Sequence, residues 1–187
     1  MNKSDIRKTI YKIRKEMTEQ EHAEQSYDIF NQIINMDVYK NAACIYAYCD
    51  INNEVATSMI IKSALSSGKR VALPKIVSVN GKDEMQFFEI TQLDETQIKK
   101  GYFGIPEPVT EITPPAPDIV IVPGVAFSKK LQRLGYGGGF YDRFLDDSMI
   151  KIAPAFEFQL YDELPCEDHD ILMDYIVTPD GKYSLNA

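Results

Sequence analysis

The sequence predicts a single α/β domain over residues 1–187, built on a largely parallel sheet. Two observations lead to this fold class. Short apolar segments bounded by turn residues alternate with amphipathic segments at helical spacing, as in a sheet whose strands are joined by crossover helices. The chain is also 44% hydrophobic and 26% charged, which is ordinary for a globular domain, and it contains no internal repeat or low-complexity tract.

Two helices are expected at the start of the chain. Apolar side chains recur there at helical spacing, at Ile6, Ile10, Ile13 and Met17. This spacing predicts an amphipathic helix from about Ser4 to Met17. Thr18 and Glu21 have the spacing of a capping box, so a second helix is expected from residue 19 to about 36.

Strands and one further helix follow in alternation. Expected strands occupy residues 43–49, 70–73, 85–90, 118–122, 150–156 and 175–178. A helix is expected at residues 55–67, closed by Gly68, and Pro74 is expected to end the second strand. Asn80 and Gly81 predict a turn, and the proline-rich segment 104–117 is expected to be irregular. Ligands of such sheets bind at the carboxyl ends of the strands, so functional residues are expected there.

Charge is distributed unevenly along the chain. The net charge of −8 argues against non-specific binding of nucleic acid, which depends on neutralising phosphates. At roughly 100° per residue, three basic side chains of the first helix border its apolar stripe, namely Lys3, Arg7 and Arg14. The others point to solvent, namely Lys8, Lys12 and Lys15. The first group suits a small anion, and a merely solvated basic face is the alternative.

Composition also limits which cellular compartment and which class of reaction are expected. No apolar run is long enough to cross a membrane and no signal peptide is recognisable, so a cytoplasmic protein without a membrane partner is expected. The cysteines, Cys44, Cys49 and Cys166, lack metal-ligand spacing and are expected to be reduced. With two histidines and no Ser/His/Asp or Cys/His pairing, nucleophilic hydrolase chemistry is disfavoured.

The glycine-rich segment at residues 133–145 carries the most chemical information. Gly135, Gly137, Gly138 and Gly139 permit a sharp turn or a close approach to a ligand, and the apolar residues after them fit the start of a helix. A glycine loop at a helix N-terminus suits phosphate. The segment matches neither the P-loop nor the dinucleotide-binding motif, and a tight turn without a ligand is the alternative.

Several acidic residues have both a structural and a functional interpretation. Asp142 either stabilises the first turn of a helix or binds Mg²⁺ beside a phosphate. Glu54 follows a buried strand and opens a helix, which suits both the helix dipole and a ligand. An acidic cluster with His169 is expected to be a solvated loop rather than a metal site; its carboxylates are Glu163, Glu167, Asp168, Asp170 and Asp174. His22 is expected to be exposed and without function.

Several short motifs, in order over nearly the whole length, resemble the 5-formyltetrahydrofolate cyclo-ligase (methenyltetrahydrofolate synthetase) family. They are Lys3 with Arg7, Glu54 with Val55, residues 104–108, residues 122–127, residues 133–142, Gln159, Pro165, residues 169–170 and residues 174–178. The resemblance implies a three-layer α/β sandwich akin to sugar-phosphate isomerases and CoA transferases. It implies ATP- and Mg²⁺-dependent conversion of 5-formyltetrahydrofolate to 5,10-methenyltetrahydrofolate, with release of ADP and phosphate.

The resemblance also assigns roles to individual residues. ATP binding is implied for Lys3, Arg7, Arg133, Leu134, Gly135, Tyr136, Gly137, Gly138, Gly139, Phe140 and Tyr141. Folate binding is implied for Cys49, Glu54, Tyr136, Gly138 and Phe140, with Glu54 on the pterin. Metal binding is implied for Asp142 and Asp174, and catalysis for Arg133 and Tyr141. A monomer or weak dimer is expected.

One departure and two alternatives accompany this resemblance. Family members commonly carry Asp and Gly where this chain has Ser128 and Leu131, and the changed loop is expected to affect rate more than reaction type. One alternative function is an enzyme of related fold that acts on a sugar phosphate without ATP or folate. The other is a protein that binds folate or nucleotide without converting it.

Overall fold

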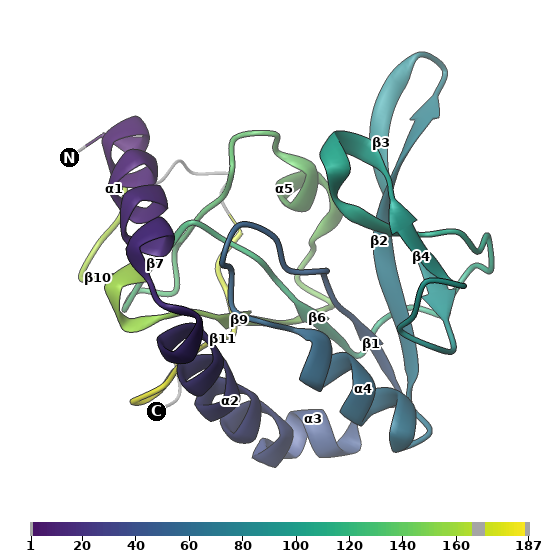
Figure 1. The fold of residues 1–187 in the computed structure, drawn as a ribbon, viewed down its shortest axis with the longest axis horizontal. Coiled ribbons are helices and arrows are strands. Elements are labelled where there is room, and N and C mark those ends of the chain that lie inside the picture. The colour runs from purple at the N-terminus through teal and green to yellow at the C-terminus, as the bar shows by residue number, and fades with distance from the viewer. Residues whose placement is uncertain (1, 166–170, 186–187) are drawn as a thin grey trace.

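A seven-stranded mixed sheet forms the middle of the fold (Figure 1). The computed structural model describes residues 2–165 and 171–185. The strands lie in the order β12 (Gly181–Tyr183), β11 (Tyr175–Thr178), β9 (Ile150–Pro154), β6 (Ile119–Ile121), β1 (Cys44–Tyr46), β2 (Arg70–Val79) and β3 (Lys82–Ile90). The inner strands run parallel, whereas β3 and β12 pair antiparallel at the edges. The predicted α/β class with a mainly parallel sheet is therefore confirmed.

Helices cover one face of this sheet. α2 (Glu19–Asn35), α3 (Asp37–Asn41) and α4 (Ser58–Ser66) lie together on that side (Figure 1). Ile33 of α2 and Ile60 of α4 are fully buried there, in one core with Ile45 of β1 and Ile121 of β6. This packing buries the alternate residues of the strands that point toward the helices.

A second layer covers the opposite face. It consists of α5 (Phe140–Phe144) and a three-stranded sheet of β10 (Leu160–Tyr161), β7 (Ala126–Ser128) and β8 (Arg133–Leu134). Tyr46 and Val120 share a core on this side with Phe127 of β7. α1 (Lys3–Glu16) packs next to β7, where Ile6 and Ile10 are buried. The large sheet is thus enclosed between two layers, as expected for a three-layer sandwich.

The second strand is longer than predicted, because Pro74 does not end it. β2 continues to Val79 and pairs with β3 along this whole extension. β1 pairs with β2 only as far as Ala72, so beyond that residue one edge of β2 is open. The N–H of Ile76 points to this open edge, where Oε1 of Glu107 accepts it at 3.3 Å. The nitrogen of Pro74, two residues earlier, faces the same edge, so its missing N–H removes no bond between strands.

Other boundaries also differ from the prediction. The helix expected at 55–67 begins at Ser58, and the strand expected at 43–49 is β1 at Cys44–Tyr46. The proline-rich segment is not wholly irregular, since β5 (Pro106–Pro108) pairs antiparallel with β4 (Ile98–Lys100). Short 3₁₀ turns occupy Tyr102–Gly104 and Glu157–Gln159. The strands of two or three residues are too short to show a hydrophobic period in the sequence.

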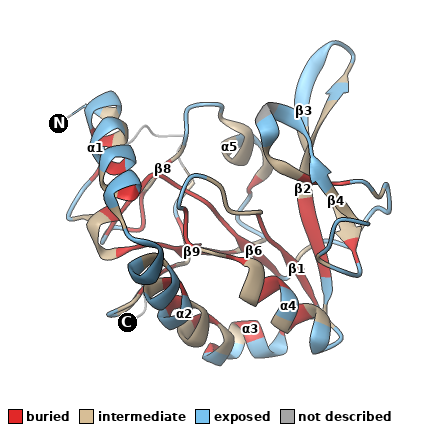
Figure 2. Cartoon of the chain, in the orientation of Figure 1, coloured by how far each residue is buried: buried red, intermediate tan, exposed pale blue. Residues whose placement is uncertain are grey.

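The two N-terminal helices agree closely with the prediction. The capping box of Thr18 and Glu21 is formed at the start of α2. On α1, Arg14 is buried and Lys3 and Arg7 are half-buried. The three lysines expected to point to solvent are exposed, namely Lys8, Lys12 and Lys15, and Figure 2 shows the outer side of α1 as exposed. The predicted division of the basic residues into a body-facing group and a solvated group is confirmed.

The two residues that depart from the family pattern lie where β7 turns into β8: Ser128 ends β7 and Leu131 lies in the turn. Leu131 has a left-handed backbone (φ +64°), the conformation for which a glycine is usual. Its side chain is only 1% exposed and packs in the core beneath α5. Oγ of Ser128 accepts the N–H of Lys130 at 3.2 Å, as a short polar side chain does in such turns.

The described cysteines are free thiols, as predicted. Cys44 is buried and Cys49 half-buried. Burial raises the pKa of Cys44 to about 11 and that of Cys49 to about 12. Cys166 lies outside the described residues. In the described ranges, no helix has the length and apolar character needed to span a membrane.

Candidate active site

A cavity of about 380 Å³ opens beyond the carboxyl ends of β1 and β6. The residues after these strands form its floor, the β2–β3 hairpin forms one wall, and the glycine-rich loop with α5 forms another. Its lining residues are Tyr48, Cys49, Ile51, Glu54, Pro74, Ile76, Met85, Tyr102, Ile105, Glu107, Pro123, Arg133, Gly135, Tyr136, Gly138, Gly139, Phe140, Tyr141 and Asp142. The location at the strand ends is the one predicted for a ligand of this sheet class.

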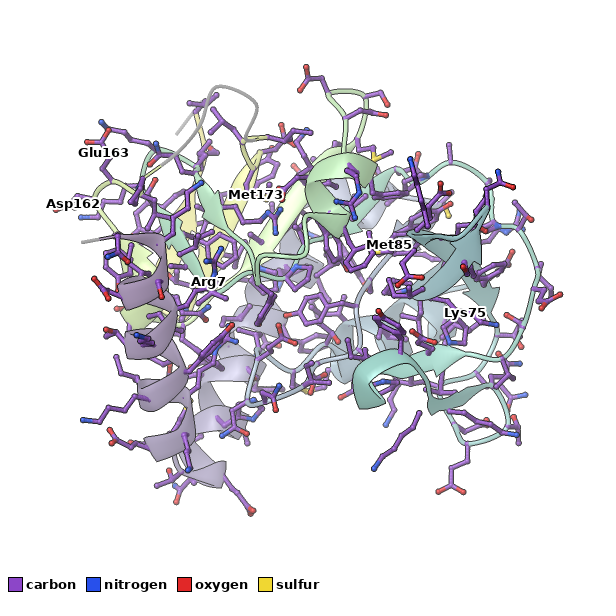
Figure 3. The ribbon with its side chains drawn as sticks, turned by 90° about the horizontal axis from the view of Figure 1, so that it is seen from above. Arg7, Lys75, Met85, Asp162, Glu163 and Met173 are labelled. Atoms are coloured by element: carbon purple, nitrogen blue, oxygen red, sulfur yellow. The ribbon has the colours of Figure 1, made fainter. Side chains whose placement is uncertain are left out.

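Two arginines brace the glycine loop from opposite sides. Nε of Arg7, on α1, donates a hydrogen bond of 2.9 Å to the carbonyl of Gly135, and Figure 3 shows Arg7 on the inner side of that helix. Nη1 of Arg143, on α5, donates to the carbonyl of Gly138 at 3.2 Å. Gly137 (φ +103°) and Gly139 (φ +66°) have the left-handed backbone that this turn requires. α1 thus contacts the loop at Arg7, and the resemblance implies ATP binding for both.

Next to the glycine loop, the positive charge of the cavity comes mainly from side chains. α5 has only five residues, so its macrodipole is weaker than the sequence suggested. The side chain of Arg133 is 4% exposed; it donates to the carbonyl of Pro123 at 3.3 Å and forms an ion pair with Asp142. Its guanidinium also lies over the Tyr141 ring, 5.8 Å from the centroid.

Two polar groups in this region lack a partner. Nε of Arg133 and the hydroxyl of Tyr141 are buried and have no hydrogen-bond partner among the described residues. Burial raises the pKa of Tyr141 well above its usual value, so its hydroxyl stays protonated and can donate. Buried polar groups are nearly always satisfied in native proteins. A bound anion would supply the acceptor that these two donors require.

Glu54 lies at the floor of the cavity and is 4% exposed. It does not open a helix as predicted, because a turn through Asn52 and Asn53, both with positive φ, separates β1 from α4. Oε2 accepts the N–H of Ile51 at 3.0 Å, and Oε1 accepts the hydroxyl of Tyr136. Burial raises the pKa of Glu54, although these hydrogen bonds and the charge of Arg14 oppose the rise.

The prediction that His22 is exposed was wrong. The residue is half-buried, and its Nε2 lies 2.6 Å from the carbonyl oxygen of Glu54. Its ring also meets Phe156 edge-on, with centroids 5.7 Å apart. His22 therefore supports the backbone of the turn that presents Glu54.

Most of the implied site residues come together. Ten of them line the cavity: Cys49, Glu54, Arg133, Gly135, Tyr136, Gly138, Gly139, Phe140, Tyr141 and Asp142. Gly137 lies in the same loop, where a β-carbon would be 3.8 Å from the Arg7 guanidinium. Leu134 instead packs with Ile6 and Ile10 in the core, and Lys3 lies at the first turn of α1.

The two implied metal ligands are not brought together. Asp142 lines the cavity, whereas Asp174 precedes β11 at the amino ends of the parallel strands. There Asp174 accepts the N–H of Lys151 at 2.7 Å and pairs with its Nζ at 3.1 Å. Across residues 2–165 and 171–185, no three His, Cys, Asp or Glu side chains are grouped as a metal site.

The structure describes only part of the acidic cluster. Glu163 pairs with Lys130 at 2.8 Å, with both side chains more than half exposed, which agrees with a solvated loop. Glu167, Asp168, His169 and Asp170 lie outside the described residues. The choice between a solvated loop and a metal site therefore stays a prediction for these four.

Sequence reasoning missed several residues of the cavity. The hairpin residues Pro74, Ile76 and Met85 were missed because the second strand was ended too early. Glu107 is 8% exposed and lines the cavity, although its motif was used only for the family resemblance. Arg14 was placed on the correct face of α1 but without a partner. Its position on the border of the apolar stripe was the available signal.

Comparison with known proteins gives a consistent result. Residues 1–179 match the model of the 5-formyltetrahydrofolate cyclo-ligase family. A 5-formyltetrahydrofolate cyclo-ligase of Haemophilus influenzae is 35% identical over 186 residues, covering 94% of this chain and 97% of that protein. One from Escherichia coli is 29% identical over 174 residues, covering 89% and 94%. The NMR structure of Aquifex aeolicus 5,10-methenyltetrahydrofolate synthetase has a TM-score of 0.85 and 30% identity, covering 100% of this chain and 94% of that one.

Proposed function

This chain belongs to the 5-formyltetrahydrofolate cyclo-ligase family, and we propose that its cavity binds 5-formyltetrahydrofolate beside ATP and converts it to 5,10-methenyltetrahydrofolate, ADP and phosphate. One observation carries the proposal. A single cavity holds a buried carboxylate, Glu54, and the arginine-braced glycine loop. A hydrogen-bond acceptor for a pterin and a cationic loop for phosphate thus lie within reach of one substrate pair.

The folate half of the cavity has a polar end and apolar walls. The Glu54 carboxylate would accept hydrogen bonds from the amino and ring N–H groups of the pterin, because each of its oxygens has a further lone pair. Ile76, Met85 and Ile105 line the same cavity and offer apolar surface to the rings. Figure 3 shows Met85 on the side of the hairpin and Arg7 on the side of α1. This division between polar and apolar lining is typical of small-molecule sites.

The phosphate half would bind ATP. Nε of Arg133 and the hydroxyl of Tyr141 are donors without acceptors, and Arg7 adds charge at the loop. Asp142 would hold Mg²⁺ together with the phosphates, since this ion commonly takes one or two carboxylates and substrate oxygens. When bound, Mg²⁺ would neutralise charge on the phosphates. Asp174, which pairs with Lys151 at the amino ends of the strands, takes no part in this site.

The reaction asks the chain mainly for positioning and neutralisation of charge. The formyl oxygen is a poor leaving group, so it first attacks the γ-phosphorus of ATP, and the bond to the ADP oxygen breaks. N10 then adds to the formyl carbon and loses its proton, and the C–O bond breaks as phosphate leaves. Arg133 and Tyr141 would stabilise the charge that develops on the transferred group. Glu54 would hold the pterin so that the formyl group faces the loop.

The direct test is the appearance of methenyl product absorbance with 5-formyltetrahydrofolate, ATP and Mg²⁺. We expect product only when all three are present, with one ADP released for each product. Tight folate binding with no product at any enzyme concentration would instead identify a binding protein. Turnover of a sugar phosphate without nucleotide would identify an isomerase-like enzyme. Either result would overturn the proposal.

A further inference from the structure

A chain of hydrogen bonds links α1 to the folate carboxylate. Arg14 is 3% exposed, and its Nη1 donates to the hydroxyl of Tyr136 at 2.7 Å. That hydroxyl in turn donates to Oε1 of Glu54. Nη2 of Arg14 donates to the carbonyl of Gly124 at 2.8 Å, which fixes the guanidinium against the loop after β6. Three segments that are far apart in the sequence therefore meet at the Glu54 carboxylate.

The surroundings of this chain of bonds hold it in one geometry. The Tyr136 ring stacks on Tyr11 of α1, with centroids 6.3 Å apart and an interplanar angle of 13°. Nδ2 of Asn53 donates to the backbone carbonyl of Arg14 at 2.8 Å, so the turn before Glu54 is tied to the same helix. Nε of Arg14 is buried without a hydrogen-bond partner among the described residues. Burying a charged guanidinium with an unpaired N–H costs free energy unless a nearby negative charge compensates for it.

The positive charge of Arg14 acts on the carboxylate of Glu54. Burial disfavours the ionised carboxylate, and no arginine or lysine is hydrogen-bonded to it directly among the described residues. Arg14 supplies the opposing positive charge across the Tyr136 hydroxyl. The other groups facing Glu54 do not replace it. Asp50 adds negative charge, and Tyr11, Tyr48 and Tyr141 are neutral phenols. His22 contacts the backbone carbonyl of Glu54 and not its carboxylate.

We propose that Arg14 is a positioning residue for folate binding, which acts through the Tyr136 hydroxyl to hold the Glu54 carboxylate ionised and oriented into the cavity. The inference rests on the proposed function, because it takes Glu54 as the acceptor for the pterin. Tyr136 occupies one lone pair of Oε1 and leaves another for the ligand. Arg14 need not touch the substrate, since it does not line the cavity.

The test uses Arg14→Gln, Tyr136→Phe and the double variant, with Lys15→Gln as a matched control from the exposed face of α1. Affinity for 5-formyltetrahydrofolate is measured by calorimetry without ATP. We expect each single variant to weaken folate binding about tenfold, as the loss of one charge-assisted hydrogen bond does. The double variant should bind no more weakly than Arg14→Gln, because both changes break the same link. Lys15→Gln should bind as the wild type does.

The pH dependence separates positioning from a merely structural role. Without the charge of Arg14, Glu54 should stay protonated to a higher pH, so folate affinity in Arg14→Gln should be lost at a higher pH than in the wild type. Arg14→Lys, which keeps the charge, should restore the wild-type pH profile in part. A structural defect would instead lower affinity equally at every pH and would not respond to lysine.

Several outcomes would overturn the inference. Additive losses in the double variant would show that Arg14 and Tyr136 act separately. Tighter folate binding by Tyr136→Phe would show that the hydroxyl blocks the acceptor rather than positions it. If Arg14→Gln fails to fold, Tyr136→Phe still tests the inference. It removes only the hydroxyl that links Arg14 to Glu54 and keeps the ring that stacks on Tyr11. Absence of folate binding in the wild type would refute the proposed function itself, whereas wild-type binding that is unchanged in both variants would refute only the role of Arg14.

Discussion

Asp142→Asn separates two roles of one carboxylate. In the structure Asp142 is the ionic partner of Arg133, whose side chain is 4% exposed, whereas Asp142 itself is 37% exposed. Breaking a fully buried pair costs about 3–5 kcal/mol, and an exposed pair contributes about 0–1 kcal/mol. A pair with one buried and one accessible member should fall between them, at about 2 kcal/mol. For a chain of this length, that corresponds to a loss of roughly 4–8 °C in Tm.

The assay combines thermal unfolding with the Mg²⁺ dependence of turnover. We expect Asp142→Asn to lower Tm in the absence of any ligand and to raise the Mg²⁺ concentration needed for half-maximal rate. Asp147→Asn makes the same chemical change at an exposed position on the chain just after α5 and should alter neither quantity. An unchanged Tm would refute the assigned energetic role of the pair with Arg133. An unchanged Mg²⁺ response would remove Asp142 from the metal site, whatever the change in Tm.

Three further predictions concern the cavity and the helix beside it. Glu54→Gln should raise the KM for folate about 10–100-fold by weakening two charge-assisted hydrogen bonds, with little change in the KM for ATP, and should abolish the loss of affinity at low pH. Ile10→Ala, at a fully buried position, should destabilise the fold by about 2–5 kcal/mol in denaturant unfolding. Cys49, whose pKa is raised to about 12, should react with iodoacetamide at pH 8 at least about a hundredfold more slowly than a free thiol, as followed by peptide mass mapping.

Helical periodicity predicted the N-terminal part of the fold well. The stripe of Ile6 and Ile10 fixed which side of α1 is buried, and the position of Arg7 followed from it. Strand ends were harder to predict, because local rules assign Pro74 to a break. Whether a proline interrupts a strand depends on the neighbouring strand, and here β1 ends before Pro74 is reached. That information is not local to the residue.

The candidate site was predictable in its parts but not in its connections. The rule that ligands bind at the carboxyl ends of strands placed Glu54 and the glycine loop at one edge, and both line the cavity. The partner of Arg14 is 122 residues away along the chain, at Tyr136. A helical wheel gives the direction of a side chain but not the group it will meet. The same limit explains why Asp142 was assigned to a helix dipole or a metal and not to Arg133.

The turn at Ser128 and Leu131 shows where a departure in sequence is expected to act. The left-handed backbone of Leu131 costs about 1–2 kcal/mol relative to glycine, while burial of its side chain contributes about 2–3 kcal/mol. The two effects nearly offset each other, so the turn keeps its conformation, with Ser128 accepting the N–H of Lys130. Neither residue lines the cavity. We therefore expect the departure to leave both the stability of the β7–β8 turn and the rate of the reaction nearly unchanged, because β8 delivers Arg133 to the cavity in either case.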